Sequence, residues 1–182
     1  MNLIRSLMTQ LAPAVRLKRR LVGPTRPTWS EEFETIATVM RRGADYSVLL
    51  PLSVQRQVID PKRPDSDVVR ATHIEAVDVD GIPGQWFTPP DARKDRVVVY
   101  FHGGGYSVGS VRSHRDLISR VAHGARCPVL AVDYRLAPEH PFPAQMEDGL
   151  KTLRWLEKQG FPASRVALSG ESAGAGLVLS TM

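Results

Sequence analysis

Cysteine is nearly absent from this sequence of 182 residues, which contains only Cys127. One thiol cannot form an internal disulfide, and no residues at metal-ligand spacing surround it. Cys127 opens an apolar run that reaches Tyr134, which is typical of a cysteine in a buried strand, with a reactive thiol as the alternative. The sequence therefore predicts no metal site, and the lack of disulfides fits a cytoplasmic protein best.

Long hydrophobic runs are absent as well. No stretch approaches the roughly 18 uninterrupted apolar residues of a transmembrane helix. A signal peptide is not expected either, because Pro13 interrupts the first apolar segment and basic residues between Arg16 and Arg20 stand where a cleavage site would be. The chain is 42% hydrophobic, enough for a core, and its length suggests one domain.

Acidic residues are missing from residues 1–26. This segment carries six basic residues, one more than the net charge of +5 of the whole chain: Arg5, Arg16, Lys18, Arg19, Arg20 and Arg26. The favoured interpretation is the polar face of a helix, and weak contact with an anionic membrane surface is the alternative. Nucleic acid is not an expected partner, because no recognised motif follows and no aromatic residues are interleaved with the charges.

The first 65 residues have a helical pattern. Apolar residues recur at helical spacing from Leu3 to Val15 and predict a helix that kinks or ends near Pro13. A capping box of Thr28 and Glu31 predicts the start of a second helix, which Gly43 would end. A short third helix is expected over residues 46–50, and a turn-rich linker over residues 60–66.

From residue 66 onward the pattern changes to alternating strands and helices. Alternating residues predict a hairpin over residues 73–88. Continuous apolar runs predict strands buried on both faces at residues 96–101, 128–134 and 165–169. Helices are expected between them at residues 113–125 and 144–158, and another after Ser172. This order predicts an α/β fold with a mostly parallel sheet and helices on both faces.

A G-x-S-x-G motif occupies residues 170–174, between an expected strand and an expected helix. Three fixed letters are a weak signal alone, and the strand–turn–helix context makes them specific. Such a tight turn requires small residues on both sides of the serine. The Ser172 hydroxyl would then lie at a helix start, where free amides favour negative charge. We predict that Ser172 is a nucleophile, with a purely structural serine turn as the alternative.

A second motif, His-Gly-Gly-Gly-Tyr, occupies residues 102–106 directly after an expected buried strand. Consecutive glycines let backbone amides approach a substrate oxygen without interference from side chains. Acyl transfer passes through an oxyanion that such donors stabilise. A flexible turn and a phosphate cradle are the alternatives, although the spacing matches no nucleotide-binding motif. We predict an oxyanion hole, with the amide of Ala173 as a further donor.

Together with DYRLAPEHPFPA at residues 133–144, these two motifs make the sequence resemble the hormone-sensitive-lipase-like (family IV) carboxylesterases and lipases. That family is a branch of the α/β-hydrolase fold. The resemblance implies that residues 1–65 form an N-terminal helical cap over the acyl pocket, and that residues 66–182 form an α/β-hydrolase core.

The resemblance also implies roles for individual residues. Ser172 would be the nucleophile, and the amides of Gly103, Gly104 and Ala173 would form the oxyanion hole. The family hydrolyses small carboxylic esters, usually with short or medium acyl chains, and uses no cofactor. Ala175 departs from the pattern, because many relatives have glycine there.

The histidines before the serine have other expected roles. His102 is expected to order the glycine loop through hydrogen bonds rather than to act as a catalytic base. His140 is expected in a structural loop, where Arg135 and Glu139 would form ion pairs. The remaining histidines have no context that suggests a function: His73, His114 and His123.

A catalytic acid and a catalytic base are missing after the serine. In this fold the acid and then the histidine follow the nucleophile in the sequence, but the residues after Ser172 read AGAGLVLSTM. We therefore expect a C-terminally truncated fold, ending in the helix after Ser172, that is inactive alone. The strand before Ser172 would then be an exposed apolar edge. The alternative is a naturally short protein that pairs with another chain, for instance as a homodimer.

Two functions of different classes remain open. The first is an ester hydrolase of which this chain supplies the nucleophile and the oxyanion hole. The second is a non-catalytic module of the same fold that binds a small ligand, although the intact Ser172 argues against it.

Overall fold

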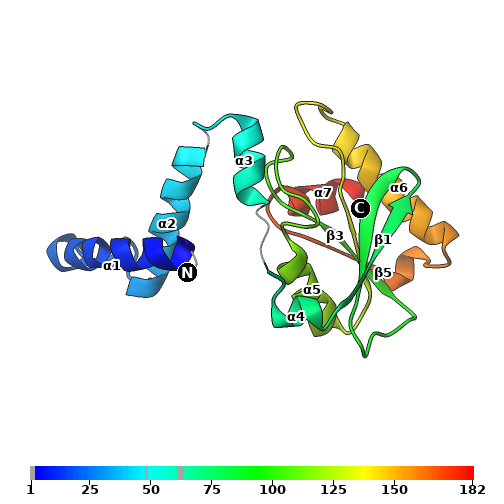
Figure 1. Ribbon diagram of the computed structural model, residues 1–182, viewed down its shortest axis with the longest axis horizontal. Helices are drawn as coiled ribbons and strands as arrows, with labels where there is room; N and C mark the ends of the chain where they lie inside the picture. The colour runs from blue at the N-terminus through cyan, green and yellow to red at the C-terminus, as the bar shows by residue number, and fades with distance from the viewer. Residues whose placement is uncertain (1–2, 48, 61–63) are drawn as a thin grey trace. The chain divides into compact units, whose positions relative to one another are not determined.

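The computed structural model describes residues 3–47, 49–60 and 64–182, and the chain divides into two compact units, Met1–Pro51 and Leu52–Met182 (Figure 1). The first unit holds the helices α1 (Leu3–Val22) and α2 (Glu31–Ser47). The second unit holds α3 (Leu52–Ile59) and the whole sheet. The structural boundary therefore precedes residue 65, where the sequence pattern suggested one.

Three helix boundaries differ from the sequence predictions. Of the two outcomes expected at Pro13, a kink or an end, the end does not occur, because helix α1 continues through Pro13 to Val22. Helix α2 runs past Gly43, and its cap is Ser30, whose Oγ accepts a hydrogen bond from the Phe33 amide at 3.1 Å, rather than Thr28. The third helix follows Pro51 instead of preceding it, since proline is favoured where a helix begins.

A buried carboxylate joins the two helices of the first unit. Glu34 on α2 is only 3% exposed. It accepts hydrogen bonds from Lys18 Nζ (2.7 Å), Thr25 Oγ1 (2.5 Å) and Arg19 Nη1 (2.6 Å). The hydrogen bonds from Lys18 and Thr25 contribute most to lowering the pKa of Glu34 to about 2. Glu34 thereby pairs with two cations of residues 1–26 and offsets one of their charges, so less charge is available for an anionic surface.

Helix α3 is fastened to the second unit by Arg56. Its guanidinium forms a bidentate pair with Glu139 (2.8 and 2.7 Å) and donates to the carbonyl oxygens of Ser107 (2.9 Å) and Ala137 (3.1 Å). Planar bidentate pairs of this kind hold their partners in one geometry. These contacts explain why α3 belongs with the sheet and not with α1 and α2.

The sheet has the strand order β1-β2-β4-β3-β5. Its strands are β1 (His73–Val79), β2 (Ile82–Thr88), β3 (Val97–Phe101), β4 (Val129–Val132) and β5 (Val166–Gly170). Strands β1 and β2 form the predicted hairpin, and β2 runs antiparallel to β4. Strand β3 pairs in parallel with both β4 and β5. The predicted α/β fold is confirmed.

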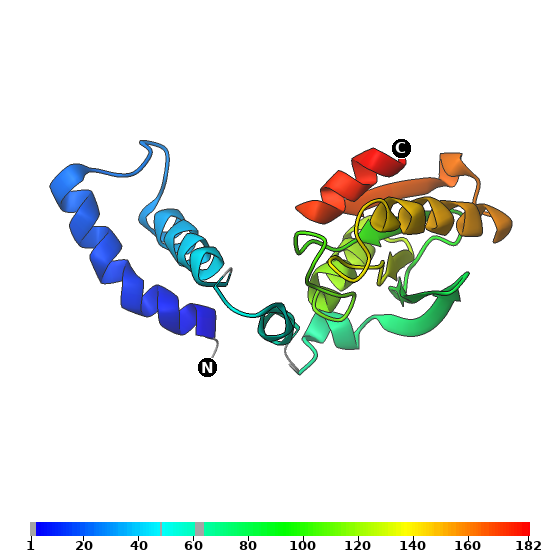
Figure 2. The same ribbon diagram turned by 90° about the horizontal axis from the view of Figure 1, so that it is seen from above.

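Helices cover both faces of this sheet (Figure 2). Helix α5 (Arg115–Ala125), beside the short α4 (Asp67–Arg70), packs on the face that carries Val98 and Tyr100. Helices α6 (Ala144–Lys158) and α7 (Ala173–Thr181) pack on the opposite face, against Val99 and Phe101. A 3-10 turn, Ala163–Arg165, leads into β5. Since both faces of β3 are covered, all five of its residues are buried, as the apolar run predicted.

Strand β5 lies at the edge of the sheet in the described part of the chain. Beside it is a cavity of about 470 Å³ whose lining includes Phe161, Val166, Leu168 and Val178. This agrees with the expectation of an apolar edge at the strand that precedes Ser172. None of the helices that the structure describes is both long and apolar enough to cross a membrane.

Replacing Glu34 with Gln is expected to loosen the packing of α1 on α2. Because the pKa of Glu34 is lowered from 4.5 to about 2, its contribution to stability is present above about pH 4.5 and is lost as the pH falls toward 2. Amide hydrogen exchange at pH 7 should be faster in both helices of the E34Q variant. The control is Glu32→Gln on the exposed side of α2; equal acceleration in both variants would contradict this role of Glu34.

Candidate active site

The turn between β5 and α7 holds Ser172 in a strained backbone conformation. Its φ of 53° and ψ of −121° lie in a region that residues other than glycine rarely adopt. The side chain is exposed, and α7 begins at the next residue. This is the strand–turn–helix context that the G-x-S-x-G motif predicted.

The glycines on either side of Ser172 are required by close packing. A Cβ atom at Gly170 would lie 2.6 Å from the carbonyl oxygen of Gly174. A Cβ atom at Gly174 would overlap the carbonyl oxygen of Phe101 and lie 2.8 Å from that of His102. These contacts press the start of α7 against the end of β3. They place Ser172 beside the residues that follow β3.

The glycine loop starts at that end of β3. Phe101 and Gly170 are paired across the parallel strands β3 and β5, so both motifs leave the sheet at the same edge. The φ angles of Gly104 and Gly105 are +122° and +61°, which suit glycine, and Tyr106 follows at 60°. A Cβ atom at Gly104 would lie 2.7 Å from the carbonyl carbon of Val108. The topology therefore brings the glycine loop and the serine turn to the same edge of the sheet.

The first peptides of the loop are held by side chains. The Tyr134 hydroxyl donates to the carbonyl oxygen of His102 at 2.6 Å. His102 Nδ1 lies 2.7 Å from the carbonyl oxygen of Gly103, and since a carbonyl can only accept, Nδ1 carries the proton. The amide of Gly103 donates to a carboxylate oxygen of Glu171. His102 thus makes the kind of contact with the glycine loop that the sequence suggested.

His102 is buried and neutral. It is 1% exposed and stacks on Tyr134, with ring centroids 4.4 Å apart and planes inclined by 14°. Burial, which disfavours the charged ring, lowers the pKa of His102 to about 4. Its Nε2 has no hydrogen-bond partner within the described residues. A neutral ring fixed in one tautomer suits the ordering of a loop.

The Gly103 amide was expected to be a donor of the oxyanion hole. In the structure, it donates its hydrogen bond to the carboxylate of Glu171 instead. By contrast, no acceptor in the described residues meets the amides of Gly104, Gly105 or Ala173. The free amides of Gly104 and Gly105 come directly after the peptides that the side chains hold, and the free amide of Ala173 comes directly after the strained Ser172. Gly105 was not expected as a donor, because its free amide depends on the loop conformation.

Ser172 has no base beside it in the described chain. No side chain there forms a hydrogen bond with its hydroxyl, which also makes no capping bond to α7. His114 instead pairs with Glu171, with 3.0 Å between Nε2 and Oε1. His123 Nε2 contacts the Thr72 hydroxyl at 3.1 Å. The sequence offered no signal for the His114–Glu171 contact, because the variable position of the motif carries no pattern.

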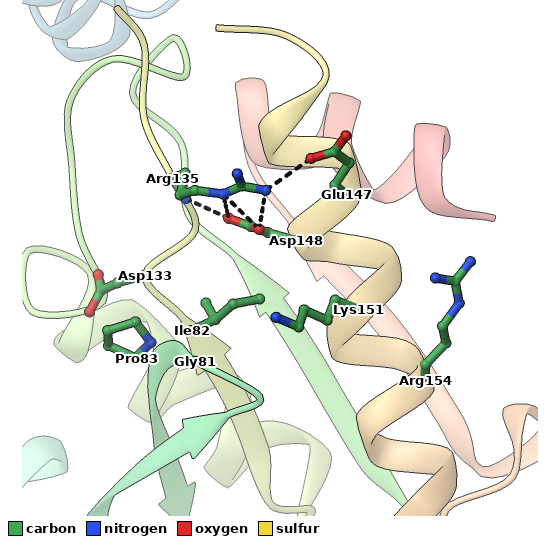
Figure 3. A pocket seen from close by; sticks show the side chains of 9 residues that line it. All are labelled: Gly81, Ile82, Pro83, Asp133, Arg135, Glu147, Asp148, Lys151 and Arg154. Carbon is green, nitrogen blue, oxygen red and sulfur yellow. Dashed lines mark hydrogen bonds and ion pairs between the residues drawn. The ribbon is translucent and has the colours of Figure 1, made fainter. Parts of the chain in front are cut away.

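Arg135 and Glu139 both form ion pairs, although not with each other. Figure 3 shows the Arg135 guanidinium against α6, where Nη2 lies 2.7 Å from Asp148 and 3.0 Å from Glu147. The amide of Arg135 also donates to Asp148 at 2.8 Å. This cluster lines a cavity of about 570 Å³. It fixes the chain after β4 on α6, which is a structural role.

A second cavity borders the glycine loop. Its volume is about 400 Å³, and it lies between the loop, the start of α6 and the first turns of α7. Most of its lining is apolar or small: Gly105, Tyr106, Ala137, Phe142, Gln145, Met146, Gly176, Leu177 and Ser180. Its size falls in the range of small-molecule sites.

Comparison with known proteins places these features in a family. Residues 98–182 match the model of a family described as having the alpha/beta hydrolase fold. The chain is 44% identical over 120 residues to an acetyl-hydrolase of Streptomyces hygroscopicus, covering 65% of this chain and 37% of that protein. It is 45% identical over 98 residues to the carboxylesterase NlhH of Mycobacterium tuberculosis, covering 51% and 31%.

The chain is also similar to a solved structure. It is an esterase from the bacterial hormone-sensitive lipase family, with a TM-score of 0.62 and 36% identity, and the match covers 97% of this chain and 50% of that one. The chain therefore spans about a third of the length of these curated relatives and half of the length of the solved esterase.

Replacing Gly174 with Ala is expected to destabilise the second unit by roughly 1–3 kcal/mol or more, since the backbone of β3 must move. The matched control is Gly124→Ala in α5, where a Cβ atom meets nothing within 4 Å and should stabilise the helix by up to about 1 kcal/mol. Urea unfolding measures both changes. Similar stability in the two variants would contradict the packing described for the turn.

His102 is expected to titrate near pH 4 in the folded protein. Its pKa is lowered from 6.5 to about 4, so as the pH falls the histidine gains its proton in the unfolded chain before it does so in the folded protein. The free energy of unfolding therefore decreases as the pH drops from about 6.5 toward 4. The chemical shifts of the His102 ring protons should stay constant between pH 5.5 and 8, a range set roughly by that pKa. A titration midpoint near 6.5 would show that the ring is not buried as described.

Proposed function

Since this chain belongs to the hormone-sensitive-lipase-like carboxylesterases of the α/β-hydrolase fold, we propose that it supplies the nucleophile and the oxyanion hole of a serine ester hydrolase. The observation that carries the proposal is the placement of Ser172 beside the glycine loop, with the amides of Gly104, Gly105 and Ala173 free. A strained, exposed serine next to unpaired backbone donors is the arrangement that acyl transfer requires.

The chemistry would proceed in two steps. The Ser172 oxygen attacks the ester carbonyl, a base takes the hydroxyl proton, and the free amides stabilise the oxyanion. Collapse of this intermediate breaks the bond to the alcohol, which leaves with the proton and gives an acyl-enzyme. Water then attacks the acyl group by the reverse proton route and releases the acid and the free serine. No step requires a cofactor.

In this proposal, neither of the two histidines nearest the glycine loop is the catalytic base. His102 is unsuited, because its burial lowers its pKa to about 4 and its Nδ1 is bound to the loop. Both ring nitrogens of His114 are engaged, Nε2 with Glu171 and Nδ1 with the carbonyl oxygen of Ser110, each at 3.0 Å. A segment beyond residue 182 or another chain would supply the acid and the histidine. By itself, this chain is therefore proposed to be inactive.

The substrate proposed is a small ester with a short or medium acyl chain. The cavity of about 400 Å³ beside Gly105 has room for a group of that size. The similarity to an acetyl-hydrolase supports a short acyl group. The cap role of residues 1–65 stays a prediction, since only the helices themselves are described.

The proposal extends to the location and the partners of the protein. The cytoplasm is favoured because the single cysteine, Cys127, cannot form an internal disulfide. Contact of residues 1–26 with an anionic membrane surface is the weaker proposal, since Lys18 and Arg19 are both paired with Glu34, which offsets one of their charges. Pairing of the β5 edge with a second copy is a further prediction, supported by the apolar cavity beside it.

A non-catalytic module that binds a small ligand is the second candidate function. The observation that favours it is the absence of a base near Ser172 in the described residues. The two candidates differ in the reactivity of the serine, because a fluorophosphonate labels only an activated nucleophile.

Hydrolysis of p-nitrophenyl butyrate tests the proposal. The chain of 182 residues should show no turnover above its Ser172→Ala variant. A longer protein that carries this sequence together with an acid and a histidine should hydrolyse the ester and react with a fluorophosphonate. Its Ser172→Ala variant should lose activity by about 10⁶-fold, as expected for a catalytic serine.

Two results would contradict this account. A longer protein that binds small esters but is never labelled would favour the binding module. Turnover by the chain of 182 residues that depends on Ser172 would show that an upstream histidine, or one from a second copy, is the base.

A further inference from the structure

Glu171 connects the serine turn to the glycine loop. It occupies the position of the G-x-S-x-G motif that can be any residue, between Gly170 and Ser172. Its carboxylate accepts a hydrogen bond from the Gly103 amide, and its Oε1 lies 3.0 Å from His114 Nε2. Its side chain is 39% exposed, so the contact is made at the rim of the site and not in the core.

The peptide between His102 and Gly103 is held at both of its polar ends. In a trans peptide the carbonyl and the amide point in opposite directions within one plane. The carbonyl of His102 accepts from the Tyr134 hydroxyl at 2.6 Å, and the amide of Gly103 donates to Glu171. The plane of this peptide is therefore fixed from two sides by different elements.

The next peptide is held at one end only. The carbonyl of Gly103 is bound by His102 Nδ1 at 2.7 Å, and the opposite end is the free amide of Gly104. Because the preceding peptide is held at both ends and this one at its carbonyl, the φ and ψ angles of Gly103 are restricted. Without the contact to Glu171, a glycine followed by two more glycines would explore many conformations, and the direction of the Gly104 amide would vary.

The carboxylate lies directly beside Gly103. A Cβ atom at that position would overlap it, with its carboxyl carbon at 2.6 Å, so a larger residue at 103 would displace the side chain of Glu171. The charge of Glu171 reaches farther into the sheet, since it adds to the burial that raises the pKa of Tyr100 to about 12. The carboxylate thus faces the loop and the buried end of β3.

We propose that Glu171 is a positioning residue: its carboxylate, paired with His114, holds the Gly103 amide so that the Gly104 amide stays directed at the oxyanion. This inference rests on the proposed function of the loop. Glu171 does not touch the substrate in this account. It acts through the two peptides that precede the donor.

Nuclear magnetic resonance of the amide of Gly103 tests the contact without any need for catalysis. In Glu171→Gln, which keeps the size of the side chain, the Gly103 amide proton should move upfield, and its exchange with solvent should become roughly ten- to a hundredfold faster. The matched control is Glu157→Gln, an exposed residue of α6. Unchanged amide shifts elsewhere in the sheet establish that the variant is folded.

A Gly103 amide resonance that is unchanged in the E171Q variant would overturn the proposal.

Kinetics separate this inference from the proposed function. In a longer protein that hydrolyses p-nitrophenyl butyrate, E171Q should lower kcat by roughly tenfold or more and leave KM unchanged, because the donor acts on the transition state. Activity that disappears in S172A but is unaffected in E171Q would overturn only the role of Glu171. A wild-type protein without esterase activity would refute the proposed function, while the Gly103 resonance would still report on the contact.

Discussion

The close approach of Gly174 to the end of β3 is the constraint on which the site depends. A helix can start this near to the carbonyl groups of Phe101 and His102 only if its residue there has no side chain. The approach brings the serine turn and the glycine loop to the same edge of two parallel strands. Ser172, two residues before Gly174, has a positive φ of 53°, and its side chain is exposed. The packing of a backbone therefore sets the position of the nucleophile.

The donors of the glycine loop depend on a second layer of contacts. Backbone amides stabilise an oxyanion only if they are already directed at it, because reorientation during the reaction would cost free energy. Three consecutive glycines provide access but no rigidity. Tyr134, His102 and Glu171 supply the rigidity by binding the peptides just before the free amides. Burial keeps His102 neutral, so its single ring proton remains on the nitrogen that holds the loop.

The sequence predicted the sheet, the serine turn and the glycine loop, because each has a local signal. Buried parallel strands read as apolar runs, and tight turns require glycine. The boundaries of the first helices were less predictable. Pro13 is tolerated within α1, and the cap of α2 is Ser30, a choice that depends on the path of the chain between the two helices. The contact between Glu171 and Gly103 joins residues 68 positions apart. No local pattern could have indicated that the Gly103 amide is already occupied.

The most direct test of the account is a crystal structure of a covalent phosphonate adduct on Ser172, in a longer protein that carries this sequence. The account predicts that one phosphonyl oxygen lies about 2.7–3.1 Å from the amide nitrogens of Gly104 and Ala173, with the Gly103 amide still bound to Glu171. An adduct whose oxygen turns away from these amides, or one in which the Gly103 amide leaves Glu171 to bind it, would contradict the account.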